Sequence, residues 1–116
     1  MENEECIFCR IVRGEMPAEL IHEAENLVAF KDIYPHAPVH ILLVPKKHIR
    51  SINDLEEEDR TVLSDLVFSA KKIAVEQGID KTGYKLVYNV ERGGGQDVFH
   101  LHLHVLGGRQ LGWPPG

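Results

Sequence analysis

The chain has 116 residues, with 13 basic and 18 acidic side chains and a formal charge of −5. A chain of this length fits one domain, here residues 1–116, and no long basic run suits it to wrapping a nucleic acid. No apolar stretch reaches membrane-spanning length, and the acidic first five residues fit neither a signal nor a transit peptide, so we expect a cytoplasmic protein.

The first half of the chain predicts a short helix followed by three strands. Apolar residues at helical spacing are followed by Gly14 and Pro17, which end the helix. Two β-prone runs follow as a hairpin, and a loop with two prolines then leads to a third run that begins near His40. The expected elements are a helix over 6–12, strands over 20–23, 27–31 and 39–44, and a loop over 32–38.

The second half predicts one long helix, two strands and an irregular tail. Acidic residues crowd the start of the helix, apolar residues repeat at spacings of three and four, and Gly78 ends it. Strands grouped around one long helix indicate an α+β fold with an antiparallel sheet. The expected elements are a helix over roughly 55–77, strands over 85–90 and 98–106, a loop over 91–97 and a tail over 107–116.

The most informative motif is His100-Leu101-His102-Leu103-His104, in which imidazoles alternate with leucines. Alternate residues of a strand point to opposite faces, so the histidines should share one face and the leucines the other. Histidine serves as base, acid, nucleophile or metal ligand near neutral pH, and three would fill a core poorly. A solvated strand is the plainer alternative. A catalytic zinc on all three is disfavoured because the third lies too far along the strand.

A run of three glycines, 93–95, precedes the histidine motif. Such a run lets backbone amides approach a ligand closely and bind an anion, although glycine loops are more often only turns. Next to three histidines, the phosphate-binding interpretation gains weight, because amides and imidazolium groups both complement phosphoryl oxygens.

Residues 95–109, Gly95-Gln96-Asp97-Val98-Phe99-His100-Leu101-His102-Leu103-His104-Val105-Leu106-Gly107-Gly108-Arg109, with the ending Trp113-Pro114-Pro115-Gly116, resemble the Hint branch of the histidine triad (HIT) family. Upstream, segments 30–33, 37–40 and 44–49 match the same branch in order. The resemblance implies a HIT-like fold, with a five-stranded antiparallel sheet and one long and one short helix, extended across a homodimer. It also implies hydrolysis of purine nucleoside phosphoramidates, of the adenosine 5'-monophosphoramidate type, through a nucleotidyl-histidine intermediate without a catalytic metal.

The resemblance also assigns roles to individual residues. His102 resembles the family nucleophile, His40 the residue that orients it, and His104 the histidine that contacts phosphate. Asp32 would accept the ribose hydroxyls and Ile33 would pack on the purine of an AMP-like or GMP-like mononucleotide. The implied nucleotide site comprises Asp32, Ile33, Asn89, Gly95, Gln96, Asp97, His102, His104 and Trp113.

Two residues of this pattern, Asp97 and Trp113, need separate consideration. Asp97 stands where Hint proteins often have a hydroxyl residue, and a carboxylate beside a phosphate is repulsive unless it is protonated or turned aside. Trp113 is an apolar ring displayed between glycine and proline, which would find a surface on the second subunit of a homodimer.

Cys6 and Cys9 have a spacing that lets two thiolates reach one zinc, and His48 and His100 would complete a tetrahedral site as in some bacterial-type relatives. Four protein ligands leave no position for water, so this zinc would be structural. Two buried thiols in a reducing cytosol are the metal-free alternative.

Two other functions remain open from the sequence. A dinucleoside polyphosphate hydrolase is the chemistry of a sister branch, against which the Trp-Pro-Pro-Gly ending argues. A nucleotide-binding adaptor with little turnover is the other, although the presence of both His102 and His40 favours an enzyme.

Overall fold

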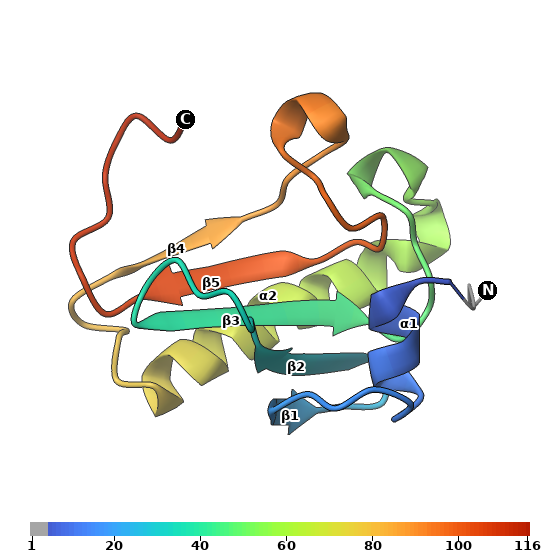
Figure 1. The fold of residues 1–116 in the computed structure, drawn as a ribbon, viewed down its shortest axis with the longest axis horizontal. Helices are drawn as coiled ribbons and strands as arrows, with labels where there is room; N and C mark the ends of the chain where they lie inside the picture. The colour runs from blue at the N-terminus through green and yellow to red at the C-terminus, as the bar shows by residue number, and fades with distance from the viewer. Residues whose placement is uncertain (1–4) are drawn as a thin grey trace.

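The computed structural model describes residues 5–116 and contains a five-stranded antiparallel sheet in the order β1-β2-β3-β5-β4 (Figure 1). The sheet places β3 in the middle, so His40 lies on a central strand as predicted. The antiparallel sheet with a long and a short helix confirms the predicted α+β class. The strands are β1 (Leu20–Glu23), β2 (Leu27–Lys31), β3 (Val39–Pro45), β4 (Tyr84–Val87) and β5 (Leu103–Gly107).

The two faces of the sheet carry different helices. Helix α2 (Arg60–Glu76) covers one face, behind the sheet in Figure 1, where its apolar stripe packs on alternate residues of β2, β3 and β5. Helix α1 (Ile7–Val12) lies at the end of β2 and β3, and its Phe8 packs with Phe30 and Leu42 on the opposite face. β2 and β3 are therefore buried on both faces, which explains their nearly continuous apolar sequence.

The long helix begins five residues later than the sequence predicts. Residues 52–54 and 57–59 form two short 3-10 turns, and α2 starts only at Arg60. The Asp59 carboxylate accepts the Glu56 amide at 2.8 Å, and the Lys47 ammonium binds Asp59 at 2.8 Å. The acidic residues near the predicted start therefore form a capping box in the preceding turn, in place of the first turn of the helix.

The histidine strand is also shorter than predicted, because β5 begins at Leu103 and not at residue 98. In the ladder with β3, Leu103 lies opposite Leu43, and this pair is the last one at this end of the ladder. The Pro45 carbonyl accepts from the ring of His100 at 2.8 Å. Residues 98–100 form a bend, and Leu101 donates its amide to the carbonyl of Ile49 at 2.7 Å, outside the sheet ladder.

No helix within residues 5–116 has the length and apolar character needed to cross a membrane.

Candidate active site and metal centre

A cavity of about 720 Å³ opens on the sheet face that carries α1. This volume lies within the range of small-molecule sites. Its walls combine apolar side chains of α1 and β2 with polar groups from β3, β5 and the loops that flank them. The cavity brings together most of the residues predicted for catalysis and nucleotide binding: Asp32, Ile33, His40, Asn89, Gly95, Asp97, His102 and His104.

His102 is buried, with 5% of its surface exposed, and one hydrogen bond sets its tautomer. Its Nδ1 lies 2.7 Å from the backbone carbonyl of His100, which can only accept, so Nδ1 carries the proton. In the neutral form of the ring, the lone pair is therefore on Nε2. Phe8 packs edge-on against this ring, with the centroids 5.1 Å apart, and fixes its plane. The arrangement presents a neutral imidazole nitrogen of the kind that attacks an electrophilic centre.

His40 and His104 form a chain of hydrogen bonds that starts at the backbone. The amide of His36 donates to Nδ1 of His40 at 3.1 Å, so the proton of His40 is on Nε2. This Nε2 lies 2.9 Å from Nδ1 of His104, which therefore accepts, and the proton of His104 is on its own Nε2. His104 is thus a hydrogen-bond donor on the cavity wall.

Burial favours the neutral form of both His40 and His104. Loss of hydration, with added repulsion from His102 and His40, lowers the pKa of His104 to about 4. Burial likewise lowers the pKa of His40, although the Asp32 carboxylate opposes the shift. His104 therefore complements a phosphoryl oxygen as a neutral donor, where the sequence suggested an imidazolium.

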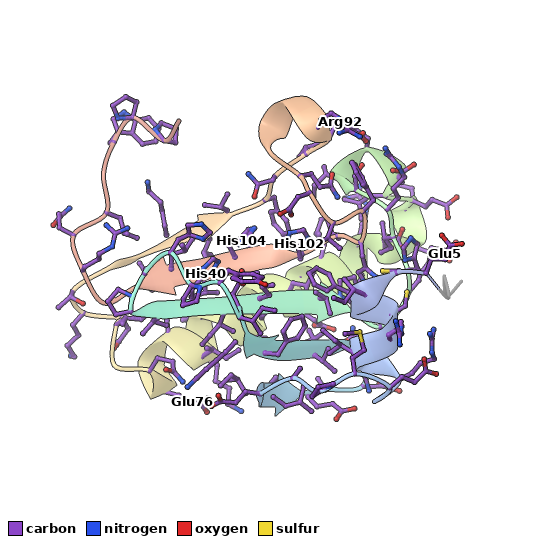
Figure 2. The ribbon with its side chains drawn as sticks, in the orientation of Figure 1. Glu5, His40, Glu76, Arg92, His102 and His104 are labelled. Carbon is purple, nitrogen blue, oxygen red and sulfur yellow. The ribbon has the colours of Figure 1, made fainter. Side chains whose placement is uncertain are left out.

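The structure corrects the expected partner of His40. The sequence resemblance implied that His40 orients His102, but the hydrogen bond of its Nε2 is to His104. The carbonyl of His100 orients His102 instead. The amide of His36, which orients His40, could not be found from side-chain patterns because it acts through the backbone. Figure 2 shows His40, His102 and His104 together on one face of the sheet.

Asp32 lies at the end of the cavity next to His40. One carboxylate oxygen accepts the Tyr34 amide at 2.9 Å, and the other lies 3.5 Å from Nε2 of His40. Ile33 and Tyr34 follow at the cavity mouth, where 73% of the surface of Ile33 is exposed. A carboxylate beside exposed apolar side chains suits a ligand with both hydroxyl groups and a flat apolar ring.

The four predicted metal ligands meet at the end of α1. Nδ1 of His100 lies 3.3 Å from Sγ of Cys6 and 3.5 Å from Sγ of Cys9, and Nδ1 of His48 lies 3.2 Å from Sγ of Cys9. All four ligand atoms lie within 4.8 Å of one another. Zinc bonds of usual length, at tetrahedral angles, separate sulfur from nitrogen by about 3.5 Å. The spacing of these donors therefore fits a tetrahedral metal ion.

The surroundings of these ligands also suit a metal. Nε2 of His100 donates to the Pro45 carbonyl, which leaves the lone pair on Nδ1 facing the sulfurs. Burial raises the pKa of the Cys6 thiol and lowers the pKa of His48, and lowers the pKa of His100 to about 4. Neutral imidazoles are ready ligands, and a cation would offset the cost of burying a thiolate.

Comparison with known proteins agrees with this geometry. The family profile for the scavenger mRNA decapping enzyme C-term binding domain matches residues 5–112. The purine nucleoside phosphoramidase of Escherichia coli K12 is 44% identical over 109 residues, which cover 94% of this chain and 92% of that protein. A HIT family hydrolase from Legionella pneumophila is 52% identical and matches with a TM-score of 0.95, over 97% of this chain and 100% of that one. The chain belongs to the histidine triad family.

A further HIT relative bears on the metal centre. The zinc-bound histidine triad family protein from Mycobacterium smegmatis is 33% identical to this chain, with a TM-score of 0.78. The match covers 91% of this chain and 76% of that one. A zinc-bound structure thus exists within the family to which this chain belongs.

The glycine run of this HIT chain is a tight turn. The amides of Gly94 and Gly95 donate to the carbonyls of Glu91 and Arg92, at 3.0 Å each, so both are used within the turn. These two amides are therefore not free to bind an anion in this structure. Gly95 lines the cavity in a left-handed conformation, with φ of 87°, while Asn89 donates to the Gly94 carbonyl at 2.7 Å.

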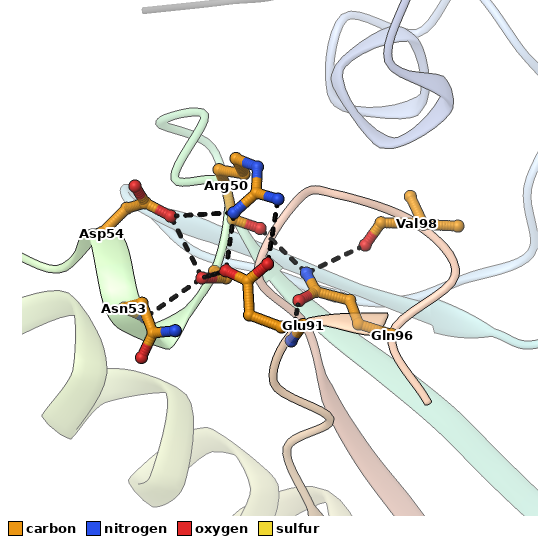
Figure 3. Close-up of polar contacts among 7 residues, drawn as sticks. Arg50, Asn53, Asp54, Glu91, Gln96 and Val98 are labelled. Atoms are coloured by element: carbon orange, nitrogen blue, oxygen red, sulfur yellow. Dashed lines mark hydrogen bonds and ion pairs between the residues drawn. The ribbon is translucent and has the colours of Figure 1, made fainter. Parts of the chain in front are cut away.

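Gln96 holds the loop from inside and is not among the residues that line the cavity. Its amide nitrogen donates to the carbonyls of Arg50 and Val98, at 2.9 and 3.1 Å. Its oxygen accepts the amide of Glu91 at 2.8 Å (Figure 3). In this structure Gln96 therefore supports the loop, in place of the predicted contact with phosphate.

Trp113 is 82% exposed and lies outside the cavity formed by its own chain, whereas Pro115 reaches its rim. The ammonium group of Lys85 on β4 holds the tail through the Gly112 carbonyl at 2.6 Å. The ring is therefore accessible for contact with another surface.

Proposed function

We propose that this protein hydrolyses purine nucleoside phosphoramidates, of the adenosine 5'-monophosphoramidate type, with His102 as the nucleophile. The observation that carries the proposal is the hydrogen bond from Nδ1 of His102 to the His100 carbonyl, which directs the Nε2 lone pair toward a substrate. The relation to an Escherichia coli purine nucleoside phosphoramidase supports the class of substrate.

The reaction takes two displacements at phosphorus. Nε2 of His102 attacks, a nitrogen–phosphorus bond to the ring forms, and the bond to the leaving amine breaks. Water then attacks phosphorus, the nitrogen–phosphorus bond to His102 breaks and the nucleoside monophosphate is released. The proton that this water gives up balances the one taken up by the departing amine. His104 donates from Nε2 to a phosphoryl oxygen throughout, and His40 holds His104 in the tautomer that can do so.

The nucleoside occupies the apolar end of the cavity. Phe8, Phe30 and Ile33 offer a surface for the purine, and the Asp32 carboxylate accepts the ribose hydroxyls. Asn89, Gly95 and Asp97 lie on the phosphate side. Asp97 brings a negative charge to that side, so it should turn away from the phosphate and toward the leaving amine.

A zinc ion held by Cys6, Cys9, His48 and His100 belongs to the same proposal. When bound, the metal would join α1 to the segments around β3 and β5, and its four protein ligands leave no open position for catalysis. The donor spacing and the zinc-bound relative support this metal. His100 then has two functions, because its ring holds the metal while its carbonyl orients His102.

We further propose a cytoplasmic homodimer of one-domain subunits, with the sheet extended through the edge strand β4. An edge strand presents unpaired backbone groups, and Leu86 of β4 is exposed. The exposed Trp113 lies on the tail that β4 holds through Lys85. In a dimer, this ring would pack beside the active site of the second subunit. The thiols of Cys6 and Cys9 suit a reducing compartment.

Trapping the covalent intermediate tests the reaction. The protein is mixed with an adenosine phosphoramidate, quenched in acid-free denaturant, digested and analysed by mass spectrometry. We expect an adenylyl group on the peptide that contains His102, and none in His102→Asn. Rapid binding of AMP with neither adduct nor turnover would contradict the proposal and favour a nucleotide-binding adaptor.

A further inference from the structure

The loop that closes the phosphate side of the cavity begins at Glu91, in an unusual backbone conformation. Its φ of 62° with ψ of 175° belongs to a region that favours glycine, so a glutamate persists there only if its surroundings hold it. Its amide donates to Gln96, and its carbonyl accepts the amides of Gly94 and Gln96 at 3.0 and 3.1 Å. Both backbone groups of Glu91 therefore take part in the hydrogen bonds that form the turn.

The carboxylate of Glu91 is fixed by the segment that follows β3. Nη1 and Nη2 of Arg50 bind its two oxygens at 2.6 and 2.9 Å, and the hydroxyl of Ser51 donates to it at 2.9 Å (Figure 3). These donors lower the pKa of Glu91 to about 2, so the carboxylate stays charged. The paired geometry fixes direction as well as distance.

Arg50 contacts the loop at its start, middle and end. Its guanidinium binds Glu91, its carbonyl accepts from Gln96 at 2.9 Å, and its guanidinium carbon lies 4.7 Å from the ring centre of Phe99. Exposed ion pairs contribute little to stability. We therefore expect the three contacts of Arg50 to contribute little to the stability of the fold and to act mainly by fixing the position of the loop.

We propose that Arg50 and Glu91 are positioning residues that set the affinity of the site for the 5'-phosphate group of its nucleotide. Between Glu91 and Phe99 the loop supplies Gly95 and Asp97 to the cavity wall, and it leads directly into His102. A change at the Glu91 carboxylate would move these groups relative to His104. The inference rests on the proposed function, because that function places a phosphate there.

Binding of AMP and of adenosine separates positioning from general damage. In Glu91→Gln we expect the dissociation constant of AMP to rise about tenfold while that of adenosine changes less than about twofold, since only the phosphate side moves. Charge alone predicts the opposite sign, because removing a carboxylate should strengthen the binding of an anion. Tighter or unchanged AMP binding in Glu91→Gln would overturn the proposal, as would an equal loss for adenosine.

Further variants separate the ion pair from backbone strain. Arg50→Lys keeps the charge but loses the paired geometry, so its AMP affinity should lie between those of the wild type and Arg50→Gln. Glu91→Gly suits the backbone but lacks the carboxylate, so it should bind AMP as weakly as Glu91→Gln while unfolding at no lower temperature. Wild-type AMP affinity in Glu91→Gly would refute a role for the ion pair.

A matched control is available on the sheet edge. Glu23 pairs with Lys46 at 2.9 Å on the surface, so Glu23→Gln removes a comparable exposed ion pair and should leave AMP binding unchanged. Turnover of the phosphoramidate distinguishes this inference from the proposed function. If the wild type binds AMP but releases no amine, only the proposed function is contradicted. The role of the loop is still decided by whether the dissociation constant of AMP rises or falls in Glu91→Gln.

Discussion

His104 should couple the stability of the fold to pH. Burial, with repulsion from His102 and His40, lowers its pKa from 6.5 to about 4. As pH falls below 6.5, the unfolded chain binds a proton at this residue and the folded chain does not, so the equilibrium shifts toward unfolding. The contribution of neutral His104 to stability is therefore complete above pH 6.5 and is lost progressively as pH approaches about 4.

The size of the effect follows from the two pKa values of His104. The interval from 6.5 to about 4, at about 1.4 kcal/mol per pH unit, gives an upper bound of about 3–4 kcal/mol in the free energy of unfolding. The ring is only partly buried at the cavity wall, and solvent screening reduces this to about 1–2 kcal/mol.

Urea unfolding of the wild type and His104→Gln at about pH 7.5 and about pH 4.5 measures this quantity. The wild type should lose about 1–2 kcal/mol more than the variant between the two conditions, because glutamine does not titrate. Ionisable groups that do not interact with His104 are common to both proteins and cancel, whereas the measured difference includes the coupling of His104 to His40 and His102. His22→Gln on β1 controls for the loss of a histidine as such. Equal losses in wild type and His104→Gln would refute the reasoning.

Three further outcomes are expected. His102→Ala should abolish release of the amine from an adenosine phosphoramidate yet bind AMP within about threefold of the wild type; near-normal turnover would contradict the role of His102. Elemental analysis after growth with zinc should find about one zinc per chain, and in Cys9→Ser the metal should fall well below this value with a lower melting temperature; metal-free wild-type protein would exclude the zinc site. Deleting residues 112–116 should change the ratio of rates for bulky and small leaving amines more than the affinity for AMP, and an unchanged ratio would show that the tail is unimportant for selectivity.

Much of this architecture could be predicted because local rules dominate it. The alternation of histidine and leucine fixes two opposite faces whatever lies around it, and Leu103 and Val105 indeed enter the core while His102 and His104 line the cavity. The spacing of Cys6 and Cys9 indicated a shared metal, the resemblance to bacterial-type relatives added His48 and His100, and the structure brings these four potential ligands together.

The remaining features depend on contacts that a sequence pattern does not record. The partner of His40 is decided by the register of β3 against β5, in which Leu42 faces His104. The ladder ends at Leu103 because the chain before it bonds elsewhere, with the Leu101 amide donating to the Ile49 carbonyl. The ion pair of Arg50 with Glu91 joins residues 41 positions apart, and both are ordinary surface residue types. No local periodicity identifies such a contact.

The four residues from His48 to Ser51 make successive contacts with the segment 91–101. His48 faces the ring of His100, the Ile49 carbonyl accepts from Leu101, and Arg50 and Ser51 both bind Glu91. The number of residues in this segment consequently sets the spacing between the metal ligands, the nucleophile and the loop. One inserted residue would shift the metal ligands against the nucleophile and the loop at once, so natural variation in chain length should be excluded here and accumulate in the exposed turns that follow.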